Sequence, residues 1–539
     1  MIEAVDALLE RWTQPGSPGC VIAVIRDGAV LHKRGYGLAH VELGVPNAPD
    51  TVFRIASITK QFTCLAVLML ARDGKLSVED EVRQHLPELP DYGVPLRIRH
   101  LMSNTSGLRD SLEAFRLTGI TLMDRRSVAE MMTIILRQEG TNFPPGSAYL
   151  YSNAGYVLLS VLIERLSGVS LRDFLQARIF GPLGMASTAL LPFDAEPFPH
   201  RAQGYAPVEG ALWRTGSGFE VCGEGGLVSS VEDMMTWMGI WGAGSHPHLD
   251  PLENLAQPAP LTASGPAGGG HARYGYGLMV ERYRGLSACG HSGLLPGFIS
   301  NILHIPERRL SVICLANSLG VNAYLTTRLI ADLVPGMDFP EPPFAKPSPA
   351  LIERLAKAGP FVDEDSGATL TFSDAEGRLG ATRFGTPFTL ANSDGAMAYT
   401  VFQGGYDVVS AEVAEEPSLA LRLTRIDGGI ETYRPVVSGP TGADLLDDYI
   451  GRYRSAELMS DWVIERACDG LVVRIEGPRG PALPCPLDAT RPDLLTGRIG
   501  WFGAQFRDAL RFHREDGHIR GFTLNASRSR GIRFVAVTN

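Results

Sequence analysis

The stretch CVIAVIRDGAVLHKRGYG, residues 20–37, predicts the start of an antiparallel sheet. It contains two runs rich in β-branched residues joined by Asp27-Gly28, a dipeptide typical of a two-residue hairpin turn. Far along the chain, FISNILHIP (298–306) and LSVICLANS (310–318) repeat this pattern and precede the helical pattern NAYLTTRLIADLV (322–334). The sequence therefore predicts one sheet that begins near residue 20 and is resumed near residue 300.

The segment between the two sheet regions is mostly helical in pattern. ITKQFTCLAVLMLARDGK (58–75) ends at Gly74 and YVLLSVLIERLSG (156–168) ends at Gly168, as many helices do. Together with the sheet, these helices predict an α+β fold in which helices pack on an antiparallel sheet. This first domain is predicted to span residues 1–335.

A proline-rich segment separates the first domain from the rest of the chain. PGMDFPEPPFAKPSPA (335–350) contains too much proline for a helix or a central strand, so it is predicted as a linker. Beyond it, short alternating runs are separated by D-G, E-G and G-P turns, which is typical of small antiparallel β-barrels or sandwiches. A break at Ser438-Gly439-Pro440 divides this tail into predicted domains at 346–437 and 441–539.

Composition and charge narrow the possible functions. The 539 residues have the composition of a globular enzyme with two or three domains. They include 49 basic and 59 acidic residues without a basic stripe, so nucleic acid is not an expected partner. The sequence shows neither a membrane-span pattern nor a secretory-signal pattern, which predicts a cytoplasmic protein without a membrane partner. Seven scattered cysteines without a C-x-x-C pair indicate no disulfide framework or zinc site, and no metal or cofactor is expected.

A serine and a lysine stand three residues apart in FRIASITKQFT (53–63), at the predicted start of a helix. Ser57 and Lys60 would therefore share one helix face. The lysine amine could accept the serine proton, while main-chain N–H groups at the helix start face a developing negative charge. Because the chain has five lysines, chance alone would produce about 0.3 such pairs. The motif is thus a candidate nucleophile that coincidence could also explain.

Two further motifs follow in order. Tyr151 and Asn153, in GSAYLYSN (146–153), are expected to point the same way from an extended loop. A phenol can exchange a proton with a leaving group, and an amide can hold a lysine amine or a substrate carbonyl. His291 and Gly293 lie before the resumed strands, where glycine would let a substrate approach closely. Each motif also has an ordinary explanation, as an aromatic helix entry or a hydrogen-bonded histidine.

In this order the three motifs resemble those of the penicillin-recognising serine hydrolases, which include class C β-lactamases, DD-peptidases and related esterases. The resemblance covers residues 1 to about 335 and includes HLMSNTSGLRD (100–110), RIFGPLGM (178–185) and GYGLM (275–279). It implies a β-lactamase-like fold for the first domain.

The resemblance also implies a role for each residue of the motifs. Ser57 would be the nucleophile, Lys60 its base partner, and Tyr151 the proton carrier to the leaving group. Asn153 would position Lys60 and the substrate amide, and the main-chain N–H groups of Ser57 and Leu294 would form the oxyanion hole. Whether Lys60 or Tyr151 is the acylation base stays open, because the two groups would titrate as a coupled pair.

His291 stands where this family usually has a lysine. Histidine is mostly uncharged at neutral pH, so recognition of a terminal carboxylate, as in a β-lactam or a D-Ala-D-Ala end, is expected to be weakened. This H-x-G motif and the β-rich tail resemble the D-stereospecific aminopeptidases, whose catalytic domain is followed by two small lipocalin-like β-barrels. There a loop of the last barrel enters the active site. The matching stretch here is 496–506, where Trp501 and Phe502 replace the expected carboxylate, although a two-residue shift would bring in Asp508.

The predicted function is therefore that of a serine hydrolase acting through a Ser57 acyl-enzyme, as a D-aminopeptidase or D-amino-acid amidase. Within hydrolases the alternatives are an esterase, a DD-peptidase or a β-lactamase; outside them the alternative is a non-catalytic penicillin-binding sensor. Intact Ser57, Lys60 and Tyr151 argue against the sensor. The expected partners are a small peptide, amide or ester substrate and a second copy of the chain in a homodimer.

Overall fold

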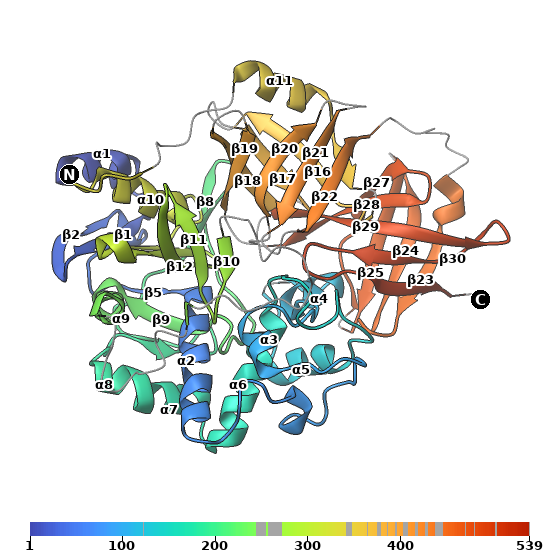
Figure 1. Cartoon of the computed structure of the whole chain (residues 1–539). Coiled ribbons are helices and arrows are strands. Elements are labelled where there is room, and N and C mark those ends of the chain that lie inside the picture. The colour runs from blue at the N-terminus through green and yellow to red at the C-terminus, as the bar shows by residue number, and fades with distance from the viewer. Residues whose placement is uncertain are drawn as a thin grey trace.

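Figure 1 shows a computed structural model of the whole chain, in which an N-terminal domain, a middle sheet and a last barrel follow one another along the sequence. The N-terminal domain carries the helices, and the two units that follow are almost entirely strands. The structure describes residues 1–121, 123–243, 255–256, 272–340, 348–363, 365–374, 379–384, 386–393, 396–402, 408–414, 419–425, 429–436, 446–468, 470–478, 480–501 and 504–537.

The N-terminal domain is built on one seven-stranded antiparallel sheet. Its strands are, in spatial order, β10 (Ala272–Tyr274), β11 (Met279–Tyr283), β12 (Leu286–Leu295), β13 (Phe298–Ile305), β14 (Leu310–Ala316), β1 (Cys20–Arg26) and β2 (Ala29–Tyr36). The two distant parts of the chain join where β1 pairs with β14, with Cys20 opposite Ala316. The predicted hairpin turn is present, with positive φ at both Asp27 and Gly28. The prediction of one sheet, begun near residue 20 and resumed near residue 300, is confirmed.

Helices cover both faces of this sheet, which explains why β1 is apolar at nearly every position. Ile22 and Val24 point into a core that contains residues of α1 and α10, whereas Val21 and Ala23 point into the opposite core, with residues of α2, α6 and α9. These helices are α1 (Ile2–Leu9), α2 (Thr59–Arg72), α6 (Asn153–Ser167), α9 (Val231–Ala243) and α10 (Ala323–Leu333).

The remaining elements of the N-terminal domain are short. The helices among them contribute to a helical region around α2 and α6 (Figure 1). They are α3 (Ile98–Met102), α4 (Ser111–Leu117), α5 (Val128–Leu136), α7 (Leu171–Leu175) and α8 (Gly181–Leu183), with strands β3 (Leu38–His40), β4 (Val45–Pro46), β5 (Val52–Arg54), β6 (Ala189–Leu190), β7 (Tyr205–Val208), β8 (Ala211–Arg214) and β9 (Leu227–Ser230).

The middle sheet has eight antiparallel strands and forms a half-barrel, covered by the amphipathic helix α11 (Pro349–Lys357). Its strands are β15 (Phe361–Asp363), β16 (Thr369–Asp374), β17 (Leu379–Arg383), β18 (Thr386–Ser393), β19 (Ala396–Phe402), β20 (Val408–Ala414), β21 (Ala420–Arg425) and β22 (Ile430–Pro435). The predicted limit at residue 335 falls between α10 and α11, and the predicted limits at 346, 437 and 441 lie outside the described residues.

The last barrel is closed, because β24 pairs with both β23 and β25. Its strands are β23 (Gly451–Ser455), β24 (Ser460–Ala467), β25 (Gly470–Gly477), β26 (Gly480–Pro481), β27 (Cys485–Arg491), β28 (Leu494–Trp501), β29 (Ala504–Glu515), β30 (His518–Asn525) and β31 (Ile532–Ala536). Both tail units are therefore small antiparallel β-structures, as the sequence predicts. No single helix in the described part of the chain is both long and apolar enough to cross a membrane.

The last barrel packs directly on the helical region of the N-terminal domain (Figure 1). The indole Nε1 of Trp462 donates to the carbonyl oxygen of Leu117 at 3.1 Å. Nearby, Arg116 of α4 binds both carboxylate oxygens of Asp508, at 2.6 and 2.7 Å, with side chains that are 1% and 0% exposed. Because separating this pair would leave an uncompensated buried charge, it holds the barrel in one position on α4.

Candidate active site

Ser57 lies in a tight turn, Ala56–Ile58, that runs directly into α2. Ala56 has a φ of 50°, a left-handed conformation that is strained for a residue with a side chain. Ser57 is partly exposed, whereas the residues on both sides of it are buried. The serine does lie at a helix start, as predicted, and the strained turn leaves it accessible.

Lys60, in the first turn of α2, is fully buried and its amine has three polar neighbours. Nζ lies 3.3 Å from Ser57 Oγ, and it donates to Asn153 Oδ1 at 2.9 Å and to the main-chain oxygen of Glu224 at 2.6 Å. Burial lowers the pKa of Lys60 to about 7, and the negative charges of Glu224 and Asp110 oppose this shift only in part. Near neutral pH the amine can therefore be uncharged and able to take a proton from Ser57.

Asn153, the first residue of α6, is held between Lys60 and Asp110. Its Oδ1 accepts from Lys60, and its Nδ2 donates to Asp110 Oδ2 at 2.8 Å. Its main-chain N–H donates to the same Asp110 oxygen at 2.6 Å. Both ends of the side-chain amide are thus engaged in orienting Lys60. The second role that the resemblance implies, contact with a substrate amide, would require one of these bonds to change.

The ring of Tyr151 is approached by two cations. Lys60 Nζ lies 4.7 Å from the ring centroid, and Cζ of Arg528, a residue of the last barrel, lies 4.9 Å from it. The ring also packs against Tyr274 in a buried aromatic cluster. Because both Tyr151 and Asn153 contact Lys60, their predicted common direction is observed.

His291, on β12, is buried and uncharged. Its Nδ1 lies 2.5 Å from the main-chain oxygen of Ser292, so Nδ1 carries the proton and Nε2 accepts from the Tyr274 hydroxyl at 2.9 Å. Burial lowers the pKa of His291 to about 3, and the charge of Lys60 adds to the shift. This lowered pKa agrees with the expectation that the motif supplies no cation at neutral pH.

Gly293 allows β12 to lie against the turn that carries Ser57. A Cβ atom at this position would lie 2.1 Å from the main-chain oxygen of Ile55 and 2.4 Å from Ser300 Oγ, so only glycine fits. The next residue, Leu294, is 39% exposed. Because Leu294 follows Gly293 on the same strand, its main-chain N–H stays the candidate for the second donor of the predicted oxyanion hole.

Two residues of the site were not singled out in the sequence. Asp110 accepts from the N–H of Glu113 and so caps α4, in addition to orienting Asn153. Glu224 holds Lys60 through its main-chain oxygen, and its buried carboxyl group accepts from the N–H and thiol of Cys222. Burial raises the pKa of the Glu224 carboxyl group. Asp110 could have been found at the end of HLMSNTSGLRD, but a main-chain contact such as that of Glu224 leaves no signature in a sequence.

The predicted inserted loop, residues 496–506, is described only in part. Its described residues form parts of β28 and β29, which pair with each other, with Trp501 opposite Ala504. Phe502 and the side chain of Trp501 lie outside the described residues. Asp508, the carboxylate that a shifted alignment would bring into the site, is bound on both oxygens by Arg116.

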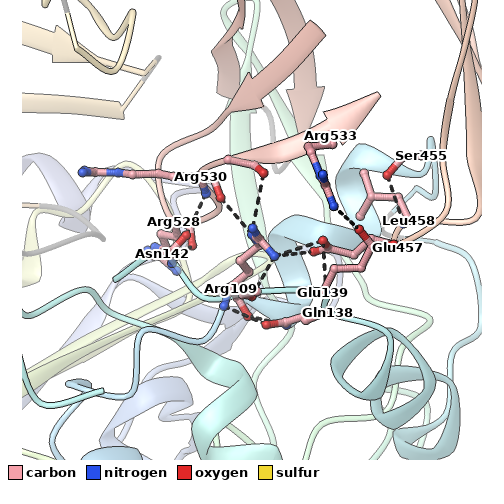
Figure 2. A network of polar contacts seen from close by, with 12 residues as sticks. Arg109, Gln138, Glu139, Asn142, Ser455, Glu457, Leu458, Arg528, Arg530 and Arg533 are labelled. Carbon is pink, nitrogen blue, oxygen red and sulfur yellow. Dashed lines mark hydrogen bonds and ion pairs between the residues drawn. The ribbon is translucent and has the colours of Figure 1, made fainter. Parts of the chain in front are cut away.

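The last barrel reaches the site through another segment, the turn 526–531 between β30 and β31, which carries Arg528. Figure 2 shows this turn against the N-terminal domain. There Arg109 Nε donates to a main-chain oxygen of the turn at 2.8 Å, and Asn142 Nδ2 donates to that of Arg528 at 3.0 Å. The last barrel thus contacts the site through this turn, which the sequence did not indicate.

The groups brought together here suit acyl transfer. They comprise a serine hydroxyl, a buried amine with a lowered pKa, a phenol and main-chain N–H groups beside the serine. No cluster of three or more His, Cys, Asp and Glu side chains that could hold a metal ion is found in the described ranges.

Comparison with known proteins agrees with this geometry. A family model described as Beta-lactamase matches residues 4–334. A D-aminopeptidase of Gluconobacter oxydans is 30% identical over 382 residues, which cover 69% of this chain and 68% of that protein. A D-aminopeptidase of Cereibacter sphaeroides is 29% identical over 544 residues, which cover 99% of this chain and 98% of that protein.

Solved structures show the same fold. The octameric penicillin-binding protein homologue from Pyrococcus abyssi aligns over 99% of both chains, with a TM-score of 0.56 and 22% identity. The D-amino acid amidase from Ochrobactrum anthropi aligns over 62% of this chain and 98% of its own, with a TM-score of 0.51 and 25% identity. The chain therefore belongs to the beta-lactamase family and is a serine hydrolase with two further antiparallel β-units behind its catalytic domain.

Proposed function

We propose that this hydrolase is a D-aminopeptidase or D-amino-acid amidase, which releases an N-terminal D-residue through a Ser57 acyl-enzyme. The observation that carries the proposal is the similarity to a protein named D-aminopeptidase over 99% of this chain, including both tail units. The D-amino acid amidase from Ochrobactrum anthropi supports the same chemistry for the catalytic domain. A catalytic domain alone would fit an esterase equally well. The two tail units therefore favour the D-aminopeptidase function over the esterase function.

In the proposed mechanism, Ser57 Oγ attacks the substrate carbonyl carbon and its proton passes to the Lys60 amine, 3.3 Å away. The carbonyl oxygen becomes an oxyanion, which the N–H groups of Ser57 and Leu294 stabilise. Tyr151 donates its proton to the leaving nitrogen and regains one from Lys60, so the C–N bond breaks and a neutral amine leaves. Water then attacks the ester, with the proton transfers reversed, and regenerates Ser57.

The rival functions differ in what they need from this site. An esterase would use the same acyl-enzyme with an alcohol as leaving group, and a DD-peptidase or β-lactamase would also bind a substrate carboxylate. A penicillin-binding sensor needs no proton for a leaving group. The contact of Lys60 with Ser57, and its pKa of about 7, therefore favour catalysis over sensing.

Paired substrates test the proposal. We expect D-alanine amide to be hydrolysed at least about tenfold faster, in kcat/KM, than L-alanine amide. N-acetyl-D-alanine amide should be slower than the free amine, because an aminopeptidase recognises the N-terminal ammonium group. Rates are compared with those on an acetate ester and a chromogenic cephalosporin. Equal rates on the two enantiomers, or faster hydrolysis of the β-lactam than of any D-amide, would contradict the proposal.

The rate of Ser57 acylation should depend on pH through Lys60. Burial lowers its pKa to about 7, so the amine is protonated and inactive as a base below that pH and becomes active above it. We expect the rate of labelling by a phosphonate reagent to rise about tenfold per pH unit below pH 7 and to level off above it. The reagent does not titrate in this range, so the pH dependence of the labelling rate reflects ionisation of groups in the protein.

A His291→Gln variant provides the control for this profile. Because burial lowers the pKa of His291 to about 3, its titration cannot produce a rise near pH 7, and the variant should keep the rise. A profile that is flat between about pH 5 and 8, or a rise that disappears with His291, would contradict the assignment to Lys60.

We also propose that the protein works in the cytoplasm. The support is that its seven cysteines are free thiols, five of them buried, which is usual for a reducing compartment. The homodimer stays a prediction from the sequence, which the mass in solution would test.

A further inference from the structure

Arg528 is a cation that the last barrel places on the face of the proton-donating tyrosine. Its Cζ lies 4.9 Å from the ring centroid of Tyr151. It is also near enough to Lys60 for its charge to contribute to the lowered pKa of that amine. The neighbouring His291 is uncharged, so Arg528 supplies a permanent positive charge where the third motif does not.

The turn that carries Arg528 is held through its main chain by two residues of the N-terminal domain. Glu113 accepts from the N–H of Arg528 at 2.8 Å and from the hydroxyl of Ser527 at 2.9 Å. Asn142 donates to the main-chain oxygen of Arg528 at 3.0 Å and accepts from the N–H of Arg530 at 2.7 Å (Figure 2). These bonds position the backbone, while the guanidinium group lies over the Tyr151 ring.

Ion pairs that do not involve Arg528 itself also stabilise the position of this turn. Arg109 donates to main-chain oxygens of the turn and binds both carboxylate oxygens of Glu457, at 2.9 and 3.0 Å. Arg109 and Glu457 are each 6% exposed. Arg530 contacts Glu431 of the middle sheet at 3.4 Å, and Glu431 is itself bound by Arg383. All three parts of the chain therefore hold this turn, as a group with a precise binding function requires.

We propose that Arg528 binds the free carboxylate of the leaving residue, so that the enzyme acts best on dipeptides whose first residue is a D-amino acid. A guanidinium group binds a carboxylate through two parallel hydrogen bonds, which gives both strength and orientation. The proposal rests on the proposed function and specifies its substrate class. It also revises the expectation, drawn from His291, that terminal carboxylates are poorly recognised.

The position of Arg528 limits the length of the leaving group. In the mechanism above, the Tyr151 hydroxyl serves the scissile nitrogen, and we assign Arg528, which lies on the same ring, to the leaving side. In a leaving group of one residue, the carboxylate carbon is two bonds from that nitrogen. Each further residue would move the carboxylate away by about 3.5 Å. A guanidinium group beside the Tyr151 ring is therefore placed for the carboxylate of the first leaving residue.

Three substrates test this proposal: D-alanyl-glycine, its C-terminal amide, and D-alanine amide. We expect wild-type kcat/KM to be about tenfold to a hundredfold higher on the dipeptide than on the dipeptide amide, as for loss of a charge-assisted hydrogen bond. Arg528→Gln should lower the ratio of kcat/KM on the dipeptide to kcat/KM on its amide to about one. Because the charge of Arg528 also acts on Lys60, this ratio, and not the rate on D-alanine amide alone, is the readout. Arg528→Lys should keep part of the preference, because an ammonium group binds a carboxylate with less directional bonds.

Arg520→Gln is the matched control, since it removes an arginine that is 54% exposed on β30 of the same barrel and should keep the wild-type preference. Equal wild-type rates on the dipeptide and its amide would overturn the proposal. So would an Arg528→Gln variant that loses the same factor on all three substrates, because Arg528 would then act through Tyr151 or the turn. If the wild type hydrolyses D-alanine amide no faster than L-alanine amide, the proposed function fails first, and the assignment to D-dipeptides fails with it.

Discussion

Replacement of Ser57 by alanine is expected to abolish covalent labelling by an active-site phosphonate and to lower kcat/KM on D-alanine amide by at least about a thousandfold. The reason is that Ser57 carries the hydroxyl group that Lys60 contacts. Ser57 also lies in a strained turn against which β12 is packed. Without it no acyl-enzyme forms, and only substrate binding and the oxyanion hole remain. Mass spectrometry of the labelled protein and steady-state kinetics measure the two losses.

Ser152→Ala is the control for the Ser57 variant. Ser152 belongs to the Y-x-N segment of the same site but is buried, so its removal should leave labelling of Ser57 in place. Labelling that survives in Ser57→Ala and maps to another serine would show that the nucleophile has been misassigned.

The proposed catalytic groups could be predicted because each lies in a short motif next to a recognisable element. Ser57 and Lys60 share a helix start, and Tyr151 and Asn153 lie at the start of a helix whose apolar run is plain in the sequence. The central sheet was predictable for a similar reason: β1 is buried on both faces, so its apolar run is continuous.

The contacts that join distant segments could not be predicted from the sequence. Glu224 acts on Lys60 through a main-chain oxygen, which any residue type could provide. Asp508 reads as an available carboxylate beside the predicted loop, but folding buries it against Arg116, 392 positions away in the chain. Pairings of this kind depend on how the last barrel packs on α4, and no local pattern encodes that packing.

The role of the turn that carries Arg528 could not be predicted from the sequence either. Its sequence, ASRSRG (526–531), reads as an ordinary polar turn between two strands. Its importance comes from its partners Glu113 and Asn142, which belong to another domain. The last barrel contacts the site through this turn, and this contact depends on the orientation of the barrel on the N-terminal domain.

Replacing Lys60 and replacing Tyr151 should have non-additive effects on kcat/KM. We expect Lys60→Met and Tyr151→Phe each to lower kcat/KM by about 10²- to 10⁴-fold, the usual contribution of general acid–base catalysis. The double variant should lose little more than the worse single variant, because the two groups pass the same proton between Ser57 and the leaving nitrogen. Methionine is chosen because Lys60 is fully buried, and its unbranched side chain replaces the lost volume without an amine.

The double variant distinguishes a shared proton path from two separate roles. If Lys60 only activated Ser57 and Tyr151 only protonated the leaving group, the two losses would multiply, and the double variant would lose up to about 10⁸-fold. Losses that multiply would therefore contradict the shared path, even though both residues contact one another in the structure. Tyr149→Phe removes a hydroxyl from a buried ring of the same aromatic cluster and should change kcat/KM by less than about threefold. With that control unchanged, non-additive losses at Lys60 and Tyr151 report proton transfer rather than loosened packing.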